Sequence, residues 1–259
     1  MIEVCDLAFS YSGRPVLKNI SFSAEKGEFV SILGANGAGK STLFKCMINV
    51  LPEYTGKVLL DGRDTHSMKV RELAQHIAYI PQMSSSSFNY SVEDIVLMGT
   101  TAGIGTLRNP GSEEKQRAIN AMDRMGISCL RKRCYHQLSG GERQLVTIAR
   151  ALAQEAEILL LDEPSASLDF GNQMLISEQA RKLASEGYTV IQTTHDPEKA
   201  HIFSDKIIAM KNGNILSQGT PSEVLTGEVI EQLYGIAVET SSLYEDKVRV
   251  FTPKELISC

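Results

Sequence analysis

The sequence predicts an α/β fold with a mixed, mainly parallel sheet, an N-terminal antiparallel β subdomain and an inserted helical subdomain. Three observations support this prediction. Near-alternating apolar residues fill positions 2–22 around a turn at Ser12-Gly13, which is typical of paired antiparallel strands. A glycine-rich loop at 34–39 separates a short apolar run from a helix expected to begin near Lys40. From about Phe88 to Glu157 the pattern is mostly helical, with strand-sized apolar runs on both sides.

The individual elements follow in chain order. Short apolar runs predict strands at 29–33, 58–60, 77–80, 158–161, 189–193 and 207–210. Ser112 is expected to cap a helix that ends at Gly126, and a second helix carries apolar residues at i, i+3, i+4 and i+7, namely Leu145, Ile148, Ala149 and Leu152. From Thr220 onward we expect a polar helix and tail. We assign residues 1–235 to one domain, with the helical subdomain inserted at about 86–157, and residues 236–259 to a short C-terminal extension.

Composition excludes several classes of protein. The chain has 259 residues, of which 42% are hydrophobic and 22% charged, so it is not a disordered protein. Its net charge of -5 argues against a nucleic-acid partner, which would require a cationic surplus. No apolar run approaches the roughly 20 residues of a membrane helix, and no secretion signal is apparent. Five cysteines without a CxxC pair are typical of reduced, cytosolic thiols.

The loop Gly34-Ala35-Asn36-Gly37-Ala38-Gly39-Lys40-Ser41 matches the phosphate-binding pattern GxxxxGK[ST]. Its glycines let successive N–H groups point at phosphate oxygens, and the following helix presents its positive N-terminus to the same anion. Lys40 is expected to reach the β- and γ-phosphates, Ser41 to ligate Mg²⁺, and Thr42 to contact the α-phosphate. The sequence therefore predicts a P-loop NTPase core, with Gly34, Asn36, Gly37, Ala38 and Gly39 lining the nucleotide.

A strand that ends in two acids supplies the second chemical signal. The run at 158–161 is followed by Asp162 and Glu163, and ligands bind where parallel strands end. Asp162 is therefore expected to face Mg²⁺. Glu163 would point to the opposite face unless the backbone turns, and Pro164 favours that turn. Glu163 is then placed to hold or deprotonate the attacking water, because phosphoryl transfer depends mainly on positioning and charge neutralisation.

The segment Leu138-Ser139-Gly140-Gly141-Glu142 is a third signal. Ser139 and Glu142 form a capping box at the start of a helix. The glycines expose N–H groups at the same helix end, so Ser139, Gly140 and Gly141 are also expected to bind an anion. A second anion site about a hundred residues after the first predicts a two-sided sandwich around one nucleotide.

Together, these three motifs resemble those of the ATP-binding subunit of ABC transporters. The resemblance runs in order from Tyr11 to about Gly219. It implies four further roles. Tyr11 would stack on adenine, and Gln82 would sense Mg²⁺ and contact the membrane partner. The loop containing Asp169 would extend to the other subunit, and His195 would contact the γ-phosphate.

The resemblance implies an ATPase that uses Mg²⁺ and works as a pair of head-to-tail copies. Lys40, Gln82, Glu163 and His195 would be its catalytic residues, and Ser41, Gln82 and Asp162 its metal ligands. Each ATP would lie between Lys40 and Asp162 of one chain and Ser139 of the other. The implied partners are separate membrane permease chains and, indirectly, a substrate-binding protein, with no nucleic acid. The implied location is peripheral, on the cytoplasmic face of the cell membrane.

Cargo follows only from finer similarity. Segments 88–99, 168–173 and 194–197 and the pair Tyr234-Gly235 are similar to importers of iron chelates, haem and cobalamin, although Thr100 stands where that group often has arginine. An importer of another substrate, such as molybdate, is the alternative.

Two other classes of protein are less consistent with the sequence. A soluble ABC ATPase of DNA repair or translation would usually carry tandem cassettes, coiled-coil or zinc insertions, or basic arms, and none of these is apparent in the sequence. An assembly module without turnover would not need Glu163.

Two further segments are weaker candidates for a functional site. Cys129, Cys134 and His136 are near neighbours, but the second ligand pair of a typical zinc site is missing. The run at 131–133 is basic and is interpreted as a solvated face rather than a nucleic-acid contact.

Overall fold

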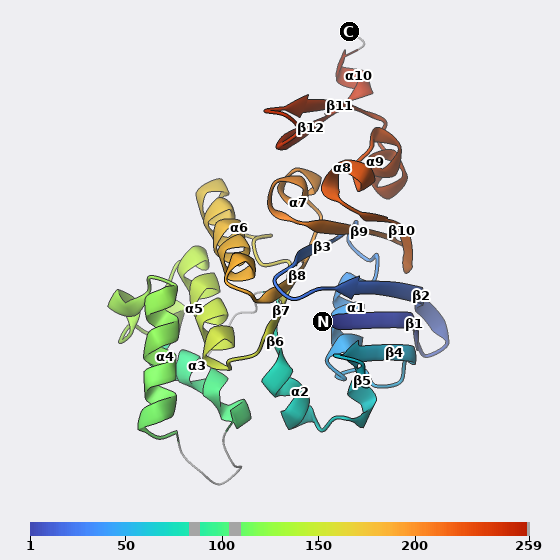
Figure 1. Ribbon diagram of the computed structural model, residues 1–259. Helices are drawn as coiled ribbons and strands as arrows, with labels where there is room; N and C mark the ends of the chain where they lie inside the picture. The colour runs from blue at the N-terminus through green and yellow to red at the C-terminus, as the bar shows by residue number, and fades with distance from the viewer. Residues whose placement is uncertain (83–88, 104–109, 258–259) are drawn as a thin grey trace. The chain divides into compact units, whose positions relative to one another are not determined.

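The protein is described by a computed structural model that covers residues 1–82, 89–103 and 110–257. The chain divides into two compact units, and its helices and strands are labelled in Figure 1. The first unit comprises Met1–Ser67 and Leu183–Cys259, and the second comprises Met68–Lys182. Phe88, used in the cargo argument, lies outside the described residues.

The first unit holds the predicted antiparallel sheet and a mainly parallel one. The antiparallel sheet has the strand order β2-β1-β4-β5. In the other, β3 pairs in parallel with β8 and β9, and β10 pairs antiparallel with β9. The bounds are β1 Ile2–Tyr11, β2 Arg14–Ala24, β3 Phe29–Leu33, α1 Lys40–Met47, β4 Thr55–Leu60, β5 Arg63–Asp64, β8 Thr189–Thr194, α7 Pro197–Phe203, β9 Lys206–Lys211 and β10 Asn214–Gly219.

Apolar patterning explains both sheets. Along β1, the alternating residues Ile2 and Val4 are buried while Glu3 is only partly so, as expected for a sheet with one packed face. All five residues of β3 are buried, because this strand has a neighbour on each edge and both faces covered. The sequence prediction of an α/β core with an antiparallel sheet and a mixed, mainly parallel sheet is confirmed.

The second unit contains a parallel strand pair and a helical block. β6 (Ile77–Ile80) pairs in parallel with β7 (Ile158–Asp162). Between these strands, α3, α4 and α5 pack against one another through the buried residues Val92, Val96, Ala118, Met122 and Ile148. The helices are α2 Val70–His76, α3 Val92–Met98, α4 Ser112–Arg124, α5 Gly140–Ala153 and α6 Phe170–Ser185, the last of which runs into the first unit. Four short 3₁₀ turns are also present in the described chain, at Thr65–Ser67, Gly99–Gly103, Ser128–Leu130 and Tyr135–Gln137.

Helix ends were predicted with mixed success. Ser112 is not the cap of α4 but its first helical residue; the N-cap is Gly111, whose N–H donates to Glu114 Oε2 at 2.7 Å. The Glu114 side chain therefore stabilises this helix end by accepting from the N-cap N–H, which is a different bond from the one a capping serine would accept. At the other end, Gly126 has a φ of +69° just beyond the helix, as the prediction of a glycine stop requires.

The prediction of a polar tail after Thr220 is wrong in part. Two short helices, α8 (Pro221–Val224) and α9 (Gly227–Tyr234), are followed by an antiparallel hairpin and a terminal turn of helix (Figure 1). The hairpin strands are β11 (Val238–Leu243) and β12 (Val248–Pro253), and the last helix is α10 (Lys254–Ile257). Three consecutive residues at the hairpin turn, 244–246, have φ between +53° and +63°. Such a turn is costly for residues with side chains unless other contacts hold it.

Asp246 supplies those contacts. Its carboxylate accepts hydrogen bonds from Ser222 Oγ at 2.6 Å, Ser242 Oγ at 2.7 Å and Arg249 Nη2 at 2.6 Å. Its backbone oxygen lies 2.7 Å from Nε2 of the buried His201 on α7. The Ser222 bond, followed by those of Ser242 and Arg249, lowers the pKa of Asp246 well below its usual range. One residue thus ties the hairpin to α7 through its backbone oxygen and to α8 through its carboxylate.

Among the described residues, no helix combines the length and the apolar character needed to cross a bilayer.

Replacing Asp246 by Asn tests the role of this carboxylate. Because the pKa of Asp246 is lowered by folding, its stabilisation is present at neutral pH and is lost as pH falls through the folded-state pKa. Asp246→Asn should therefore lower the opening free energy of β11 and β12 by about 2 kcal/mol at pH 7, the scale of a charge-assisted hydrogen bond. Amide hydrogen exchange measures this value. Glu245→Gln, a change of the same chemistry at the neighbouring exposed position, should have no effect; equal protection in both variants would contradict the assignment.

Candidate functional site

The loop between β3 and α1 curls around the side chain of Lys40. Lys40 Nζ donates to the backbone oxygens of Gly34 at 2.7 Å and Ala35 at 3.2 Å, and the residue is only 5% exposed. Gly37 and Gly39 have φ of +83° and +105°, a region that disfavours other residues. Gly39 is the N-cap of α1, so the helix N-terminus begins inside the loop. A curled chain, a helix N-terminus and an ammonium group together form an anion-binding arrangement.

The position of this loop depends on a close backbone approach at Gly34. A Cβ at residue 34 would lie 2.4 Å from the backbone oxygen of Met210 on β9, so only glycine fits. The Gly34 N–H donates to Thr194 O at the end of β8, at 3.2 Å, and Gly213 N–H donates to Ala38 O at 3.1 Å. The loop is thus fixed to both neighbours of β3.

His195 follows β8 directly, next to the residue that accepts the bond from Gly34. Its side chain is exposed, and its backbone oxygen accepts a hydrogen bond from Tyr234 Oη at 2.9 Å. Asp196 then caps α7, accepting from Lys199 N at 3.0 Å. The turn that carries His195 is therefore held by contacts on both sides of it.

Three further predicted residues of the first unit are exposed or partly exposed. Tyr11 ends β1, is 44% exposed and packs edge-on against Phe9, with ring centroids 4.8 Å apart, so a broad part of its surface is open to solvent. Ser41 and Thr42 lie in the first turn of α1, where Ser41 is exposed and Thr42 half-buried.

In the second unit, β7 ends at the buried Asp162, which is 3% exposed. Asp162 Oδ2 accepts a hydrogen bond from the Tyr79 hydroxyl at 3.1 Å. Burial, and then the neighbouring Asp162 carboxylate, raise the pKa of Tyr79 far above its usual value, so the hydroxyl keeps its proton and acts as the donor. Glu163 has a φ of +46°, so the backbone does turn directly after Asp162, as Pro164 suggested.

The helix that begins after Ser139 has both bonds of the predicted capping box. Ser139 N–H donates to Glu142 Oε2 at 2.7 Å, and Glu142 N–H donates to Ser139 Oγ at 3.3 Å. The first of these bonds, together with the serine hydroxyl, lowers the pKa of Glu142, which stays ionised at the positive end of α5.

Gly140 and Gly141 bring this helix end against the loop that carries Asp169. A Cβ on Gly140 would lie 2.9 Å from Leu168 Cδ2, and one on Gly141 would lie 2.1 Å from Asn172 Oδ1. Asp169 accepts from Asn172 N at 2.9 Å and from Asn172 Nδ2 at 2.7 Å, and the backbone bond lowers its pKa. Two predicted motifs, far apart in the sequence, are thus packed together within the second unit.

Gln82 is exposed at a bend just after β6 and is followed by residues outside the described ranges. Tyr79, which bonds to Asp162, is a residue to which the sequence motifs assign no role. Its position on the predicted strand at 77–80 was visible in the sequence, but the pairing of this strand with β7 is a finding of the structure.

The structure also describes the two weaker candidates, the cysteine–histidine group near residue 130 and the basic run at 131–133. Within the described part of the chain, no group of three His, Cys, Asp or Glu residues could hold a metal ion, so Cys129, Cys134 and His136 do not form such a site. Arg131 is paired with Glu93, with Nη2 and Oε1 2.5 Å apart, and this pairing lowers the pKa of Glu93.

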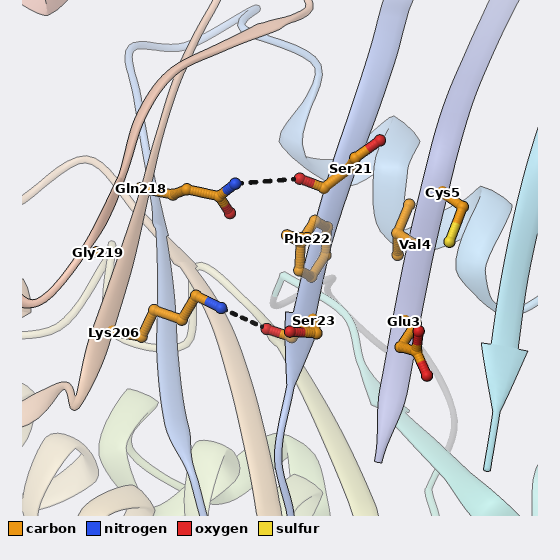
Figure 2. Close-up of a pocket in the computed structure, with 9 residues that line it drawn as sticks. All are labelled: Glu3, Val4, Cys5, Ser21, Phe22, Ser23, Lys206, Gln218 and Gly219. Carbon is orange, nitrogen blue, oxygen red and sulfur yellow. Dashed lines mark hydrogen bonds between the residues drawn. The ribbon is translucent and has the colours of Figure 1, made fainter. Parts of the chain in front are cut away.

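A separate pocket of about 490 Å³ opens in the first unit between the strand pairs β1–β2 and β9–β10 (Figure 2). Lys206 Nζ donates to Ser23 O at 2.9 Å and Gln218 Nε2 donates to Ser21 O at 3.4 Å across it. None of the residues predicted to bind nucleotide lines this pocket.

Comparison with known proteins agrees with the motifs. Residues 17–166 match the family described as ABC transporter. The chain is 38% identical to a hemin import ATP-binding protein of Rhizobium meliloti (strain 1021), over 93% of this chain and 94% of that protein. It is 36% identical to a manganese transport system ATP-binding protein of Listeria innocua, over 91% and 97%. A solved inward-facing metal-chelate type ABC transporter superimposes with a TM-score of 0.86, at 33% identity over 98% of each chain.

Proposed function

Because the chain belongs to the family of ABC transporter ATP-binding subunits, we propose that it drives import of a metal chelate such as an iron complex, haem or cobalamin. It is an ATPase of that family, and ATP is its substrate. The observation that carries the cargo proposal is the similarity to a hemin import subunit along nearly the whole of both chains. The manganese relative is almost as similar, so an importer of another substrate, including molybdate, is the competing proposal.

The proposed nucleotide contacts use the loop in the first unit. Lys40, which now bonds to loop carbonyls, would turn to the β- and γ-phosphates, while the backbone of residues 34–39 surrounds them. Tyr11 would stack on adenine with its exposed ring, and Thr42 would contact the α-phosphate. Ser139, Gly140, Gly141 and Asp169 would contact the nucleotide bound to a second copy.

The residues proposed as metal ligands suit Mg²⁺. Asp162 offers a buried carboxylate that is already hydrogen-bonded, and Ser41 and Gln82 add hydroxyl and amide oxygens. An oxygen-only set with one carboxylate, completed by phosphate oxygens, is typical of Mg²⁺. When bound, the ion neutralises charge on the β- and γ-phosphates.

The proposed catalytic step depends on Glu163 and His195. Regular alternation along β7 would point Glu163 to the face opposite Asp162, and the turn at Glu163 takes its carboxylate off that alternation. Glu163 would accept a proton from the attacking water, and His195 would contact the γ-phosphate.

Membership of the ABC transporter family also supports a proposal for the assembly of this subunit. Two copies would enclose two nucleotides. Separate permease chains would bind this pair and respond to its conformational change, and a substrate-binding protein would deliver the cargo. The subunit would lie peripherally on the cytoplasmic face of the membrane. We keep residues 1–235 as the proposed ATP-binding domain, with a helical subdomain at about 86–157, and 236–259 as its extension.

Glu163→Gln tests the proposed base. The variant keeps the shape of the side chain but cannot accept the proton, so phosphate release should fall about 10²–10⁴-fold while ATP binding persists. Glu178→Gln, on an exposed position of α6, provides the matched control and should hydrolyse ATP normally. Phosphate release by Glu163→Gln at the wild-type rate would remove Glu163 from the mechanism.

The cargo is tested by uptake. A host strain lacking the gene should lose uptake of labelled iron chelate, haem or cobalamin. The wild-type gene should restore it, whereas the Glu163→Gln gene should not, because transport requires turnover. Labelled manganese and molybdate form the comparison set. Loss of uptake confined to either of these would replace the chelate proposal with the competing one and leave the ATPase function unaffected.

A further inference from the structure

The hydrogen bond between Tyr79 and Asp162 connects two adjacent strands at the point where chemistry is expected. On β6, Tyr79 stands opposite Leu160 of β7, and its side chain reaches toward the carboxyl end of that strand. Its hydroxyl donates to Asp162 Oδ2 at 3.1 Å. The carboxylate is 3% exposed and the tyrosine is half-buried, so solvent has little access to this bond.

A buried carboxylate in this position requires a fixed orientation. A charged group out of contact with water is costly unless it is hydrogen-bonded. Rotation of the Asp162 carboxylate about its Cβ–Cγ bond would carry Oδ2 away from the hydroxyl and break the bond. The tyrosine ring is rigid and has only two torsions, so it holds the donor in place at little entropic cost.

We propose that Tyr79 is a positioning residue for the metal site: its hydroxyl orients the Asp162 carboxylate so that an oxygen is presented to the Mg²⁺ of bound Mg²⁺·ATP. This inference rests on the proposed function, in which Asp162 ligates the ion. Groups that hydrogen-bond to a metal ligand fix its geometry, and their removal typically weakens metal binding by about 10–100-fold. Tyr79 itself does not touch the ion or the nucleotide.

The test measures metal binding separately from turnover. A fluorescent, non-hydrolysable ATP analogue is bound to the full chain, first in EDTA and then in a titration with Mg²⁺. Tyr79→Phe removes the hydroxyl and keeps the ring. It should raise the Mg²⁺ concentration for half-saturation at least about tenfold, while analogue affinity in EDTA stays at the wild-type value. Mn²⁺ binding followed by electron paramagnetic resonance should weaken in parallel.

Tyr54→Phe is the matched control. Tyr54 is buried, and its hydroxyl lies 3.3 Å from both Asn49 Oδ1 and Thr65 Oγ1, with no carboxylate partner among those contacts. Loss of this hydroxyl should alter thermal stability without moving the Mg²⁺ dependence. An equal shift of the Mg²⁺ midpoint in both variants would show a general effect of losing a buried hydroxyl and would overturn the proposal.

Asp162→Asn separates this inference from the function on which it rests. If Asp162→Asn weakens Mg²⁺ binding and Tyr79→Phe does not, the ligand assignment stands and the positioning role is refuted. If Asp162→Asn leaves Mg²⁺ binding unchanged, the ligand assignment fails, and the positioning role fails with it. In the Asp162→Asn background, Tyr79→Phe should add no further loss of Mg²⁺ affinity, because both changes act through the same carboxylate.

Discussion

The close backbone approach of Gly34 to Met210 is the constraint on which the proposed phosphate-binding loop of this protein depends. No side chain fits between the two residues, since a Cβ would lie 2.4 Å from the Met210 oxygen. The loop therefore starts in direct contact with β9, and its first N–H is bonded to the end of β8. Because α1 begins as soon as the loop ends, the positions of Lys40 and Ser41 follow from three parallel strands rather than from the loop alone. An anion entering this loop would meet donors that are already oriented, which lowers the cost of ordering them.

The second unit uses glycine for the same physical reason. Gly140 and Gly141 have no room for a side chain beside Leu168 and Asn172, so the start of α5 packs directly on the loop that contains Asp169. The capping box fixes the same helix end from within. In each unit, glycines set the helix N-terminus proposed to bind an anion against a neighbouring segment, and the charged or polar side chains are positioned as a consequence.

Local signals explain which parts could be predicted from sequence. The strands, the loop at 34–39, the capping box at Ser139 and the turn after Asp162 each depend on residues close together in the chain, and the structure contains all of them. The hairpin β11–β12 was missed because its turn is held by Asp246 through Ser222, twenty-four residues away. The Tyr79–Asp162 bond spans 83 residues and has no pattern of its own. The residues assigned to ATP are independent of what the permease carries, so the cargo proposal depends on overall similarity to import subunits.

A heterodimer experiment tests most directly whether Lys40 and Ser139 complete one site from two chains. Two differently tagged chains, one Lys40→Ala and the other Ser139→Arg, form a heterodimer with both lesions in one site and the other site intact. A wild-type chain paired with a Lys40→Ala/Ser139→Arg chain carries the same two lesions, but one falls in each site. In tag-purified heterodimers, the first arrangement should occlude one ATP and hydrolyse it measurably, and the second should do neither. Equal occlusion and hydrolysis in the two arrangements would contradict a site shared between chains.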